Sequence, residues 1–347
     1  MKKVYIRVDG NEKIATGHVM RCLSIAEQLR ELGIEVIFVV ADDRPGELIR
    51  SRKFQMEVLN SVWNDLNQET VQLCNYIRQH DVKILLLDSY YVTKEYLQKL
   101  SQYTKIIYID DLFRFDYAVH TIINYSVFVE GECYRELYKQ DNLMPSMLLG
   151  SAYIPLRKEF SYQRYKLREP VKKVLVTTGG TDQLNVTGNI LDNVIKQDDL
   201  MQLEYHVIIG CFNQNKEHLY ALEKEYSNIQ LHESVTNMSE WMRECDIAIS
   251  AGGTTLYELC ACGIPTICLE VADNQEGAVN WERKDYMQYA GNAYKDMDLC
   301  VEKCVEALRM YTKQQQIRKR KSERMQELVD GNGAKRIAEY IHKVMEG

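Results

Sequence analysis

The chain has little of what marks a membrane or secreted protein. Its 347 residues contain no run of about 18 apolar residues, the length that a membrane-spanning helix needs. Near the start, Arg7 and Asp9 interrupt any apolar core of the kind that a signal peptide requires. We therefore expect a cytoplasmic protein without a membrane anchor, and the length predicts about two domains.

The chain also lacks an excess of positive charge. It has 43 lysine and arginine residues against 50 aspartate and glutamate residues, which gives a formal net charge of −7. No basic stripe is present, and this composition argues against a nucleic-acid-binding protein. A local phosphate pocket is not excluded, because backbone N–H groups bind phosphate without any basic side chain. We expect a small-molecule ligand, with no nucleic-acid or membrane partner, and a monomer is favoured.

Metal-binding and disulfide patterns are missing as well. The ten cysteines are scattered, several of them in apolar runs, and no Cys-x-x-Cys pair occurs. The six histidines other than His18 show no spacing typical of metal ligands among themselves. The sequence therefore predicts a protein of a reducing compartment, with no metal and no cofactor.

What the sequence does contain is a strand–turn–helix–strand pattern around residues 250–259, which read SAGGTTLYEL. The short run of branched residues before it predicts a buried parallel strand. After Gly253 the apolar spacing becomes helical, and Gly263 followed by Pro265 predicts the end of that helix. The apolar residues 265–269 predict the next strand.

This turn predicts an anion site. Gly253, Thr254 and Thr255 are expected to have free backbone N–H groups at a helix N-terminus, where the helix dipole also favours negative charge. Glu258, about one turn further on, is placed to accept hydrogen bonds from ribose hydroxyls, so the pattern suggests a nucleotide diphosphate. A tight turn with a threonine cap and a solvated glutamate explains the same residues equally well.

The N-terminal segment predicts a βαβ unit whose first loop carries His18. Residues 4–8 and 34–41 predict strands, and the helical apolar pattern between them stops at Gly33. His18 lies at the start of this helix, where the dipole disfavours the imidazolium and leaves a neutral ring that can accept a proton. Gly17 shapes the turn before it. A capping or packing role for His18 stays open.

Further strands follow, and polar residues gather where they end. Strands are predicted at 82–87, 105–109 and 119–123, each followed by Asp or Asn residues. The carboxyl ends of parallel strands share one edge of an α/β sheet, and that edge binds ligands. Asp110 and Asp111 are interpreted as a turn or cap, with a metal pair as the less favoured alternative.

A polar run at 157–170 predicts an inter-domain linker, after which the strand pattern restarts. The strands predicted beyond it are 173–177, 205–209, 229–231, 247–250 and 265–269. The expected fold class is therefore α/β, with two Rossmann-like domains and a cleft between them. The predicted domains are residues 1–156 and 157–347.

Two more loops of the second domain are candidate ligand contacts. Gly180 lies in another glycine turn that a ligand can approach closely. Asn274 and Gln275 follow the last predicted strand and are neutral groups suited to sugar hydroxyls or amides. A capped helix start is the alternative interpretation of that segment.

Two such domains, with a diphosphate-type helix start in the second, suggest the two-domain glycosyltransferase architecture called GT-B. Residues 7–10 (RVDG) and 16–23 (TGHVMRCL) closely resemble the opening of the nucleotide-sugar hydrolases of pseudaminic acid biosynthesis. The second half is also similar to MurG-type glycosyltransferases. The resemblance spans almost the whole chain. Other segments that look like the hydrolase family are 109–112, 153–160, 250–258 and 273–275.

The resemblance implies hydrolysis of UDP-2,4-diacetamido-2,4,6-trideoxy-β-L-altropyranose at the anomeric carbon, with inversion and without a metal. It implies that His18 is the general base on the attacking water, and that Tyr90 approaches the sugar, with Tyr91 beside it as a competing register. Residues 114–120 and Pro155 depart from the family pattern, which affects substrate detail rather than class. The implied substrate-binding residues are Gly17, Tyr90, Arg157, Gly180, Gly253, Thr254, Thr255, Glu258, Asn274 and Gln275.

Two other functions stay open on the sequence. A glycosyltransferase on the same scaffold would use His18 to deprotonate an acceptor hydroxyl and would share the donor site. The absence of a basic or amphipathic membrane-facing patch disfavours a lipid-linked acceptor. A nucleotide-sugar-binding regulator would bind UDP without turnover and would not need His18.

Overall fold

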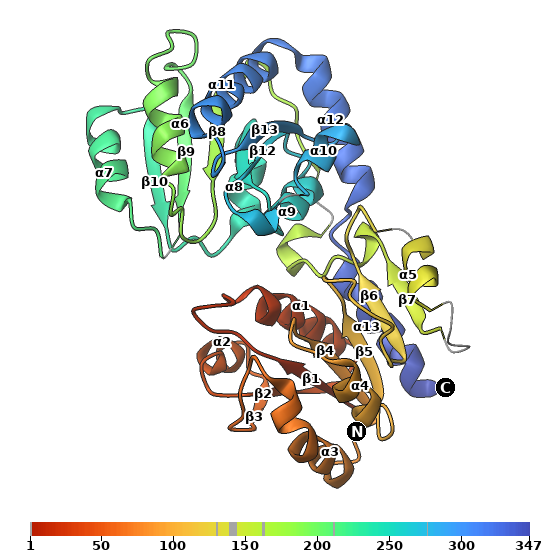
Figure 1. Cartoon of the computed structure of the whole chain (residues 1–347). Helices are drawn as coiled ribbons and strands as arrows, with labels where there is room; N and C mark the ends of the chain where they lie inside the picture. Colours follow the sequence, from red (N-terminus) through yellow and green to blue (C-terminus); the bar gives the residue numbers. More distant parts are fainter. Residues whose placement is uncertain (1, 130, 139–143, 162–163, 211, 276) are drawn as a thin grey trace. The chain divides into compact units, whose positions relative to one another are not determined.

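The computed structural model describes residues 2–129, 131–138, 144–161, 164–210, 212–275 and 277–347, and of Asn274 the backbone alone. The chain forms two compact units. The first comprises Met1–Lys158 together with Gly331–Gly347, and the second comprises Glu159–Asp330 (Figure 1). Among the described residues, no helix combines the length and the apolar character needed to cross a membrane.

The first unit is built on a seven-stranded sheet in which all the pairings are parallel. Its strand order is β3-β2-β1-β4-β5-β6-β7. Strands β2 and β3 are added on one side of β1, and strands β4 to β7 are added on its other side. The strands are β1 (Lys3–Val8), β2 (Glu35–Val40), β3 (Gln55–Val58), β4 (Ile84–Asp88), β5 (Lys105–Ile109), β6 (Thr121–Asn124) and β7 (Ser146–Leu149).

Helices cover both faces of this sheet, and its central strands are therefore buried on both sides. On β1, Val4 and Ile6 face one apolar cluster and Tyr5 faces the other, as the two-residue period of a strand requires. The helices of this unit are α1 (Gly17–Glu31), α2 (Gly46–Ser51), α3 (Thr70–Gln79), α4 (Lys94–Leu100), α5 (Gly131–Leu137) and α13 (Gly333–Glu346). Short 3-10 turns occur at η1 (Leu66–Glu69), η2 (Ser151–Tyr153) and, at the boundary, η3 (Lys158–Phe160).

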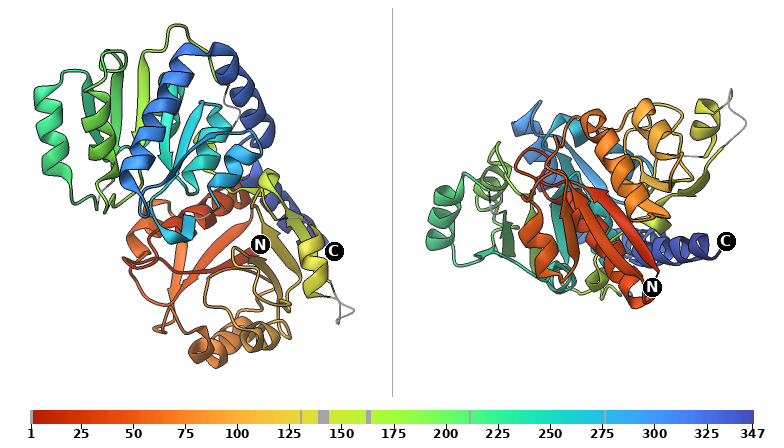
Figure 2. Two further views of the ribbon diagram at one scale, coloured as in Figure 1. Left: turned by 45° about the horizontal axis from the view of Figure 1, so that its top comes forward. Right: turned by 90° about the horizontal axis from the view of Figure 1, so that it is seen from below.

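The C-terminal helix α13 belongs to the first unit, whereas the sequence analysis assigns all of 157–347 to the second domain. Ile337 and Ile341 are buried in the same apolar cluster as Val19 and Leu29 of α1. At the start of α13, a Cβ on Gly333 would lie 2.1 Å from the Ile154 carbonyl oxygen, so the helix begins directly against the η2 segment. The expected domain limits therefore need correcting at the C-terminal end. Figure 2 shows α13, in blue, beside the strands of the first unit.

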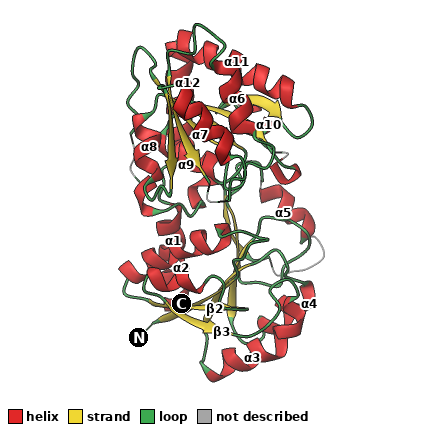
Figure 3. Ribbon diagram, turned by 90° about the vertical axis from the view of Figure 1, so that its left-hand side faces the viewer, coloured by secondary structure: helices red, strands yellow, loops and turns green. Residues whose placement is uncertain are grey.

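The second unit is a six-stranded sheet of the same kind, with all pairings parallel and the order β10-β9-β8-β11-β12-β13. Figure 3 shows the strands of this unit in yellow among red helices. The strands are β8 (Lys173–Thr177), β9 (Glu204–Ile209), β10 (Ile229–Glu233), β11 (Ile247–Ala251), β12 (Thr266–Glu270) and β13 (Gln288–Asn292). The helices are α6 (Val186–Val194), α7 (Lys216–Glu225), α8 (Met238–Glu244), α9 (Thr255–Cys262), α10 (Val279–Arg283), α11 (Met297–Lys313) and α12 (Gln315–Leu328), with η4 (Asp273–Gln275) as a short turn.

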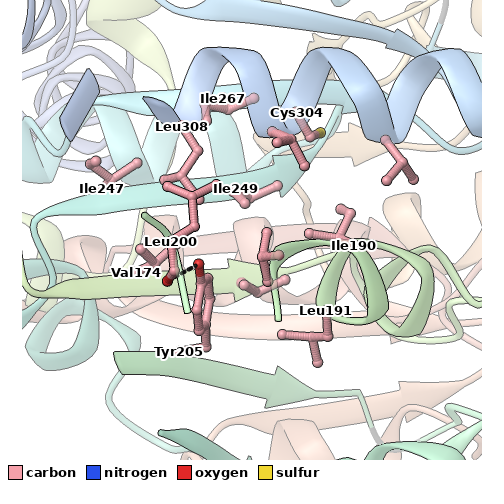
Figure 4. Close-up of a cluster of buried hydrophobic side chains, with 14 of the residues drawn as sticks. Val174, Ile190, Leu191, Leu200, Tyr205, Ile247, Ile249, Ile267, Cys304 and Leu308 are labelled. Atoms are coloured by element: carbon pink, nitrogen blue, oxygen red, sulfur yellow. Dashed lines mark hydrogen bonds between the residues drawn. The ribbon is translucent and has the colours of Figure 1, made fainter. Parts of the chain in front are cut away.

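One core of this unit lies between its sheet and helices α6 and α11. Figure 4 shows Val174 and Ile249 of the sheet among side chains from both helices, including Ile190 and Leu308. Tyr205 is buried in the same cluster, and its hydroxyl donates to the Leu200 carbonyl oxygen at 3.0 Å, which satisfies its polar atom. The fold class predicted from the sequence, α/β with two Rossmann-like domains, is confirmed.

Candidate functional site

In the first unit, several acidic residues come together at one edge of the sheet. The register pairs β1 with β4 and β4 with β5, so the carboxyl ends of these three strands are neighbours. Asp9 follows β1, Asp88 ends β4, and Asp110 and Asp111 follow β5. The edge predicted from the sequence therefore exists, and it carries the His18 loop.

The loop before α1 is shaped by its own polar groups. The Asn11 side-chain oxygen accepts from the backbone N–H of Lys13 at 2.9 Å and of Ile14 at 3.2 Å. A Cβ on Gly10 would meet Val19 Cγ2 at 2.8 Å, so this close approach requires glycine. Gly17 opens α1, directly before His18, and apart from its two chain neighbours and the backbone of its own helix no atom of the described residues lies within 4 Å of where its Cβ would be.

His18 is buried, at 7% exposure, and hydrogen-bonded to the end of β4. Its Nδ1 lies 2.7 Å from Asp88 Oδ1, and it also lies 3.0 Å from Arg21 Nη2. The two hydrogens of Nη2 are already directed at Asp88 Oδ1, 2.5 Å away, and at Asp111 Oδ2, 2.7 Å away. Nδ1 is therefore assigned as the N–H that donates to Asp88, and Nε2 as the acceptor of the neutral ring.

Asp88 is ionised in this network. Burial alone would raise the pKa of its carboxyl, but Arg21 and then His18 outweigh that effect and hold the pKa well below its usual range. Arg21 binds it through two nitrogens, with Nε donating to Asp88 Oδ2 at 2.6 Å. Burial opposes the charge on Arg21, but the surrounding carboxylates raise the pKa of Arg21 well above its usual value. A carboxylate held this way fixes the ring orientation and tautomer of the histidine.

The same residues raise the question of a metal. Ligand atoms of His18, Asp88 and Asp111 lie within 4.8 Å of one another, a spacing that a metal ion can use. The Arg21 guanidinium donates to both carboxylates and supplies a positive charge at that place. It also donates to the Tyr125 hydroxyl. A metal ion would have to displace this guanidinium.

Asp110 plays the structural role that the sequence analysis favours. Its Oδ1 accepts from the backbone N–H of Leu112 at 3.0 Å and of Phe113 at 3.1 Å, which caps the turn after β5. Its two oxygens also accept from the hydroxyls of Tyr117 and Tyr134. The interpretation of Asp110 as a cap is thus confirmed.

The two tyrosines after β4 pack against different rings. The ring of Tyr90 meets the ring of His18 edge-on, with centroids 4.4 Å apart and an interplanar angle of 80°. Burial raises the pKa of Tyr90 to about 12, so its hydroxyl stays protonated. Tyr91 instead packs against Trp63. A small pocket lined by residues including Asp9, His18 and Tyr90 opens at this point.

In the second unit, the predicted glycine turn joins β11 to α9. Gly252 N donates to the Leu269 carbonyl oxygen at 2.7 Å, but no acceptor lies near the N–H groups of Gly253, Thr254 and Thr255 within the described part of the chain. A Cβ on Gly252 would meet Ala278 Cβ at 3.0 Å, whereas a Cβ on Gly253 would meet nothing. The helix N-terminus therefore offers exposed N–H donors, the geometry of an anion site.

The other predicted residues of this unit lie on neighbouring loops. Gly180 follows β8, the strand beside β11, and its backbone packs on Gly210, whose Cβ would come within 2.2 Å of the Gly180 oxygen. Glu258 is half-buried on the first turn of α9. Gln275 Oε1 accepts from the Val271 N–H at 2.9 Å, so Gln275 folds back on its own loop. Asn274 lies in η4, and its side chain falls outside the described residues.

The remaining predicted residue, Arg157, is half-buried in the segment after η2 of the first unit. The structure therefore divides the predicted set. His18, Gly17 and Tyr90 lie together at one sheet edge, and Gly180, Gly253, Thr254 and Thr255 lie on loops at the corresponding edge of the other sheet. Asp88 and Arg21 are not predicted as site residues from the sequence. Arg21 lies three residues after His18 and so on the same helical face, which is the signal that would have pointed to it.

Comparison with known proteins places this architecture among the GT-B proteins. Residues 174–341 match the glycosyltransferase family 28 C-terminal domain. The whole chain superimposes on MurG from Acinetobacter baumannii with a TM-score of 0.71, covering 99% of this chain and 100% of that one at 15% identity. A structure of Staphylococcus aureus MnaA with UDP gives a TM-score of 0.66 at 12% identity. The fold is GT-B.

Sequence relatives narrow the resemblance further. The chain is 24% identical to the UDP-2,4-diacetamido-2,4,6-trideoxy-β-L-altropyranose hydrolase of Campylobacter jejuni, over 81% of this chain and 96% of that protein. It is 24% identical to the spore coat polysaccharide biosynthesis protein SpsG of Bacillus subtilis, over 78% of both. It is also 24% identical to the uncharacterized protein MJ1062 of Methanocaldococcus jannaschii, of which it spans 55%. The hydrolase resemblance predicted from the motifs is confirmed over most of the chain.

Proposed function

We propose that the chain hydrolyses a UDP-linked diacetamido-trideoxy sugar at its anomeric carbon, with inversion, releasing UDP and the free sugar for pseudaminic acid synthesis. One observation carries the proposal. His18 donates its Nδ1–H to a buried, ionised Asp88 2.7 Å away, which leaves Nε2 as a proton acceptor beside a small pocket. This is the arrangement of a general base with an orienting carboxylate.

In this proposal the second unit binds the nucleotide. The exposed N–H groups of Gly253, Thr254 and Thr255 receive the diphosphate, and the N-terminus of α9 stabilises its charge. Glu258, one turn along the helix, accepts hydrogen bonds from the ribose hydroxyls. The glycine loop at Gly180 gives the ligand room to approach the backbone.

The remaining predicted residues are assigned to the sugar and its phosphate. Asn274 and Gln275 contact the sugar or the phosphate next to it, and Arg157 belongs to the same set. Tyr90, edge-on to His18, approaches the sugar from the side of the base. Gly17, at the turn directly before His18, is assigned to the same part of the substrate site.

The chemistry then follows from the charges. UDP is a good leaving group, and the helix N-terminus stabilises the charge that develops on it, so no general acid is required. Water attacks the anomeric carbon from the opposite face, and His18 Nε2 takes its proton. Attack from the opposite face inverts the configuration. The imidazolium that forms is stabilised by Asp88, which stays ionised throughout.

The reaction is proposed to need no metal. The place between Asp88 and Asp111 where an ion would be expected already holds the Arg21 guanidinium, which donates to both carboxylates. The negative charge that develops during the reaction lies on the leaving diphosphate, where the backbone N–H donors of the second unit stabilise it.

A glycosyltransferase is the second candidate. The match of residues 174–341 to the glycosyltransferase family 28 C-terminal domain favours it as much as the sequence relatives favour the hydrolase. In that case His18 deprotonates an acceptor hydroxyl instead of water, and the donor site is unchanged.

The deciding experiment uses the purified chain, the UDP-diacetamido-trideoxy-altrose, EDTA and no acceptor, with the anomeric proton signals followed by NMR. Prompt release of UDP with an inverted free sugar is the expected result. A donor that stays intact until an acceptor extract is added would overturn the hydrolase and favour the transferase. A donor cleaved only when a divalent metal replaces the EDTA would contradict metal independence.

A further inference from the structure

An exposed aromatic surface borders the pocket that contains His18. Trp63, in the loop after β3, meets the ring of Tyr91 edge-on, with ring centroids 5.3 Å apart and an interplanar angle of 89°. Tyr91 is 36% exposed and also lines the pocket, and Val62, next to Trp63, is 40% exposed. Large apolar side chains that stay exposed beside a pocket indicate a surface for a ligand. We call Val62, Trp63 and Tyr91 the aromatic surface.

The loop between β3 and η1, which carries one part of this surface, is held by buried polar groups. The Ser61 hydroxyl donates to Glu69 Oε2 at 2.5 Å. Glu69 is itself buried and accepts from two nitrogens of Arg7, at 2.7 and 2.8 Å. The backbone N–H of Asp65 donates to the Val62 carbonyl oxygen at 3.2 Å, which closes the turn. A surface held this way is ordered before a ligand arrives, and this lowers the cost of binding.

The Tyr91 side of the surface is held by the neighbouring strand. The backbone N–H of Tyr91 donates to Ser89 Oγ at 3.2 Å. The Ser89 carbonyl oxygen accepts from the hydroxyl of Tyr108, a buried residue of β5, at 3.1 Å. Tyr90, between them, turns its ring edge-on to His18. The two consecutive tyrosines therefore present one ring to the proposed base and the other to the loop after β3.

We propose that the aromatic surface is a subsite for the methyl groups of the substrate sugar. The inference rests on the proposed function for the identity of that sugar, which carries acetamido groups at C2 and C4 and a methyl group at C6. These groups replace hydroxyls, and burying their methyl ends against aromatic rings is favourable. The indole N–H of Trp63 and the hydroxyl of Tyr91 are donors that suit an acetamido carbonyl oxygen.

The subsite acts on a different part of the substrate from the proposed nucleotide site. All three residues of the aromatic surface belong to the first unit, whereas UDP is assigned to the glycine turn of the second unit. Loss of the aromatic rings should therefore weaken binding of the UDP-sugar and leave the affinity for UDP alone unchanged.

The first test measures the KM for UDP release from the UDP-sugar and the affinity for UDP in Trp63→Ala and Tyr91→Ala. Each should raise the KM about tenfold, the loss expected when an apolar group of a substrate is no longer buried. Trp63→Phe keeps an aromatic ring and should stay closer to the wild type. Tyr103→Ala removes a ring that is 46% exposed and lies before β5, at the opposite edge of the same sheet, and should change neither quantity.

The second test needs no turnover. Saturation of the aromatic protons of the full chain should transfer to the methyl signals of the free sugar in NMR difference spectra. The transfer should fall in Trp63→Ala and Tyr91→Ala and be kept in Tyr103→Ala. If the wild type shows this transfer but releases no UDP from the UDP-sugar, the proposed hydrolysis has failed and the subsite stands.

Wild-type KM and wild-type methyl transfer in both alanine variants would overturn the inference. A loss of UDP affinity as large as the rise in KM would also overturn it, because the rings would then act on the nucleotide. Circular dichroism checks that each variant folds. Trp63 and Tyr91 lie on separate loops, so if one variant does not fold, the other still decides.

Discussion

The two sheet edges present different kinds of chemical group. At the edge of the first unit, the working groups are side chains with charges: His18, Asp88 and Arg21 are all at least nine-tenths buried and hydrogen-bonded to one another. At the edge of the second unit, the groups on offer are backbone N–H donors of Gly253 and Thr254, exposed and without protein acceptors among the described residues. In the proposed function, the proton acceptor needs neighbouring groups that fix its orientation and tautomer, whereas the diphosphate site needs N–H donors that are free to bind a ligand.

The glycines of the two loops are not all explained by packing. Gly10, before the His18 helix, is held by a close approach to Val19, and Gly252 is held by Ala278. Gly253 has free space around it, so packing does not explain its presence. The proposed function assigns catalysis to one edge and nucleotide binding to the other, so substitutions at each edge should have separable effects.

The largest effect is expected from His18→Asn. Loss of the base should lower kcat by about two to four orders of magnitude, with little change in the affinity for UDP. Steady-state kinetics with the UDP-sugar and calorimetric titration with UDP measure the two quantities. His80→Asn makes the same chemical change at an exposed histidine and should leave both unchanged. Near wild-type turnover in His18→Asn would remove the base from the account.

Asp88→Asn should follow in size. The amide presents an N–H group as well as an oxygen, so it no longer fixes the tautomer of His18, and kcat should fall by about a hundredfold or more. The change also leaves the buried Arg21 short of a counter-charge, which should cost about 3–5 kcal/mol of unfolding free energy. Urea unfolding measures the loss, with Asp81→Asn at an exposed pair as the control. A variant as stable as the wild type would contradict the ion-pair assignment.

Gly253→Val, at the edge of the second unit, should affect UDP binding rather than the fold. The added side chain enters open space above the N–H donors, so the fold should be kept while UDP affinity falls about tenfold, or about 1.4 kcal/mol. Gly252→Ala, one residue earlier, should instead destabilise the fold by about 1–3 kcal/mol, because its Cβ would meet Ala278 at 3.0 Å. Unchanged UDP binding in Gly253→Val would separate this turn from the nucleotide.

The smallest effect concerns a histidine pair of the second unit that lies outside its proposed site. His206 on β9 and His232 on β10 stack, with Nδ1 of one 3.1 Å from Nε2 of the other. Burial lowers the pKa of both, so the folded unit holds them neutral and the unfolded chain binds more protons below about pH 6.5. Their contribution to stability is therefore present above that pH and declines as the pH falls.

His206→Phe should flatten this dependence while leaving UDP affinity at neutral pH unchanged. Urea unfolding of the wild type and the variant at pH 7.5 and pH 5, conditions that bracket about pH 6.5, isolates the contribution as a difference. An identical loss of stability in both proteins would show that the pair does not titrate on unfolding.

The parts of the fold that follow local pattern were predictable. The strands expected at 105–109 and 173–177 coincide with β5 and β8, and the helix expected to end at Gly263 ends there with φ at +69°. Strands β3, β7 and β13 were missed because they lie at the sheet edges and their side chains are only partly buried, so the strand signal is weak. The docking of α13 on the first unit depends on contacts between distant residues, which no local pattern records.

In the candidate site, too, local features were predictable from the sequence and contacts between distant residues were not. The glycine turn and His18 are visible in the sequence because helix starts have local signatures. The bond between His18 and Asp88 joins residues 70 positions apart, so its existence depends on the register of β1 with β4. The ionised state of Asp88 needs Arg21 as well, and a network of three side chains is beyond what spacing alone predicts.

The most direct test of the division between the two edges is hydrogen exchange of the full chain with and without UDP. The account predicts slower exchange at the amides of Gly253, Thr254 and Thr255, because these N–H groups gain phosphate acceptors. The amides at the N-terminus of α1, beside His18, should change less. Protection at the His18 loop with no change at residues 253–255 would contradict the assignment of the nucleotide to the second unit.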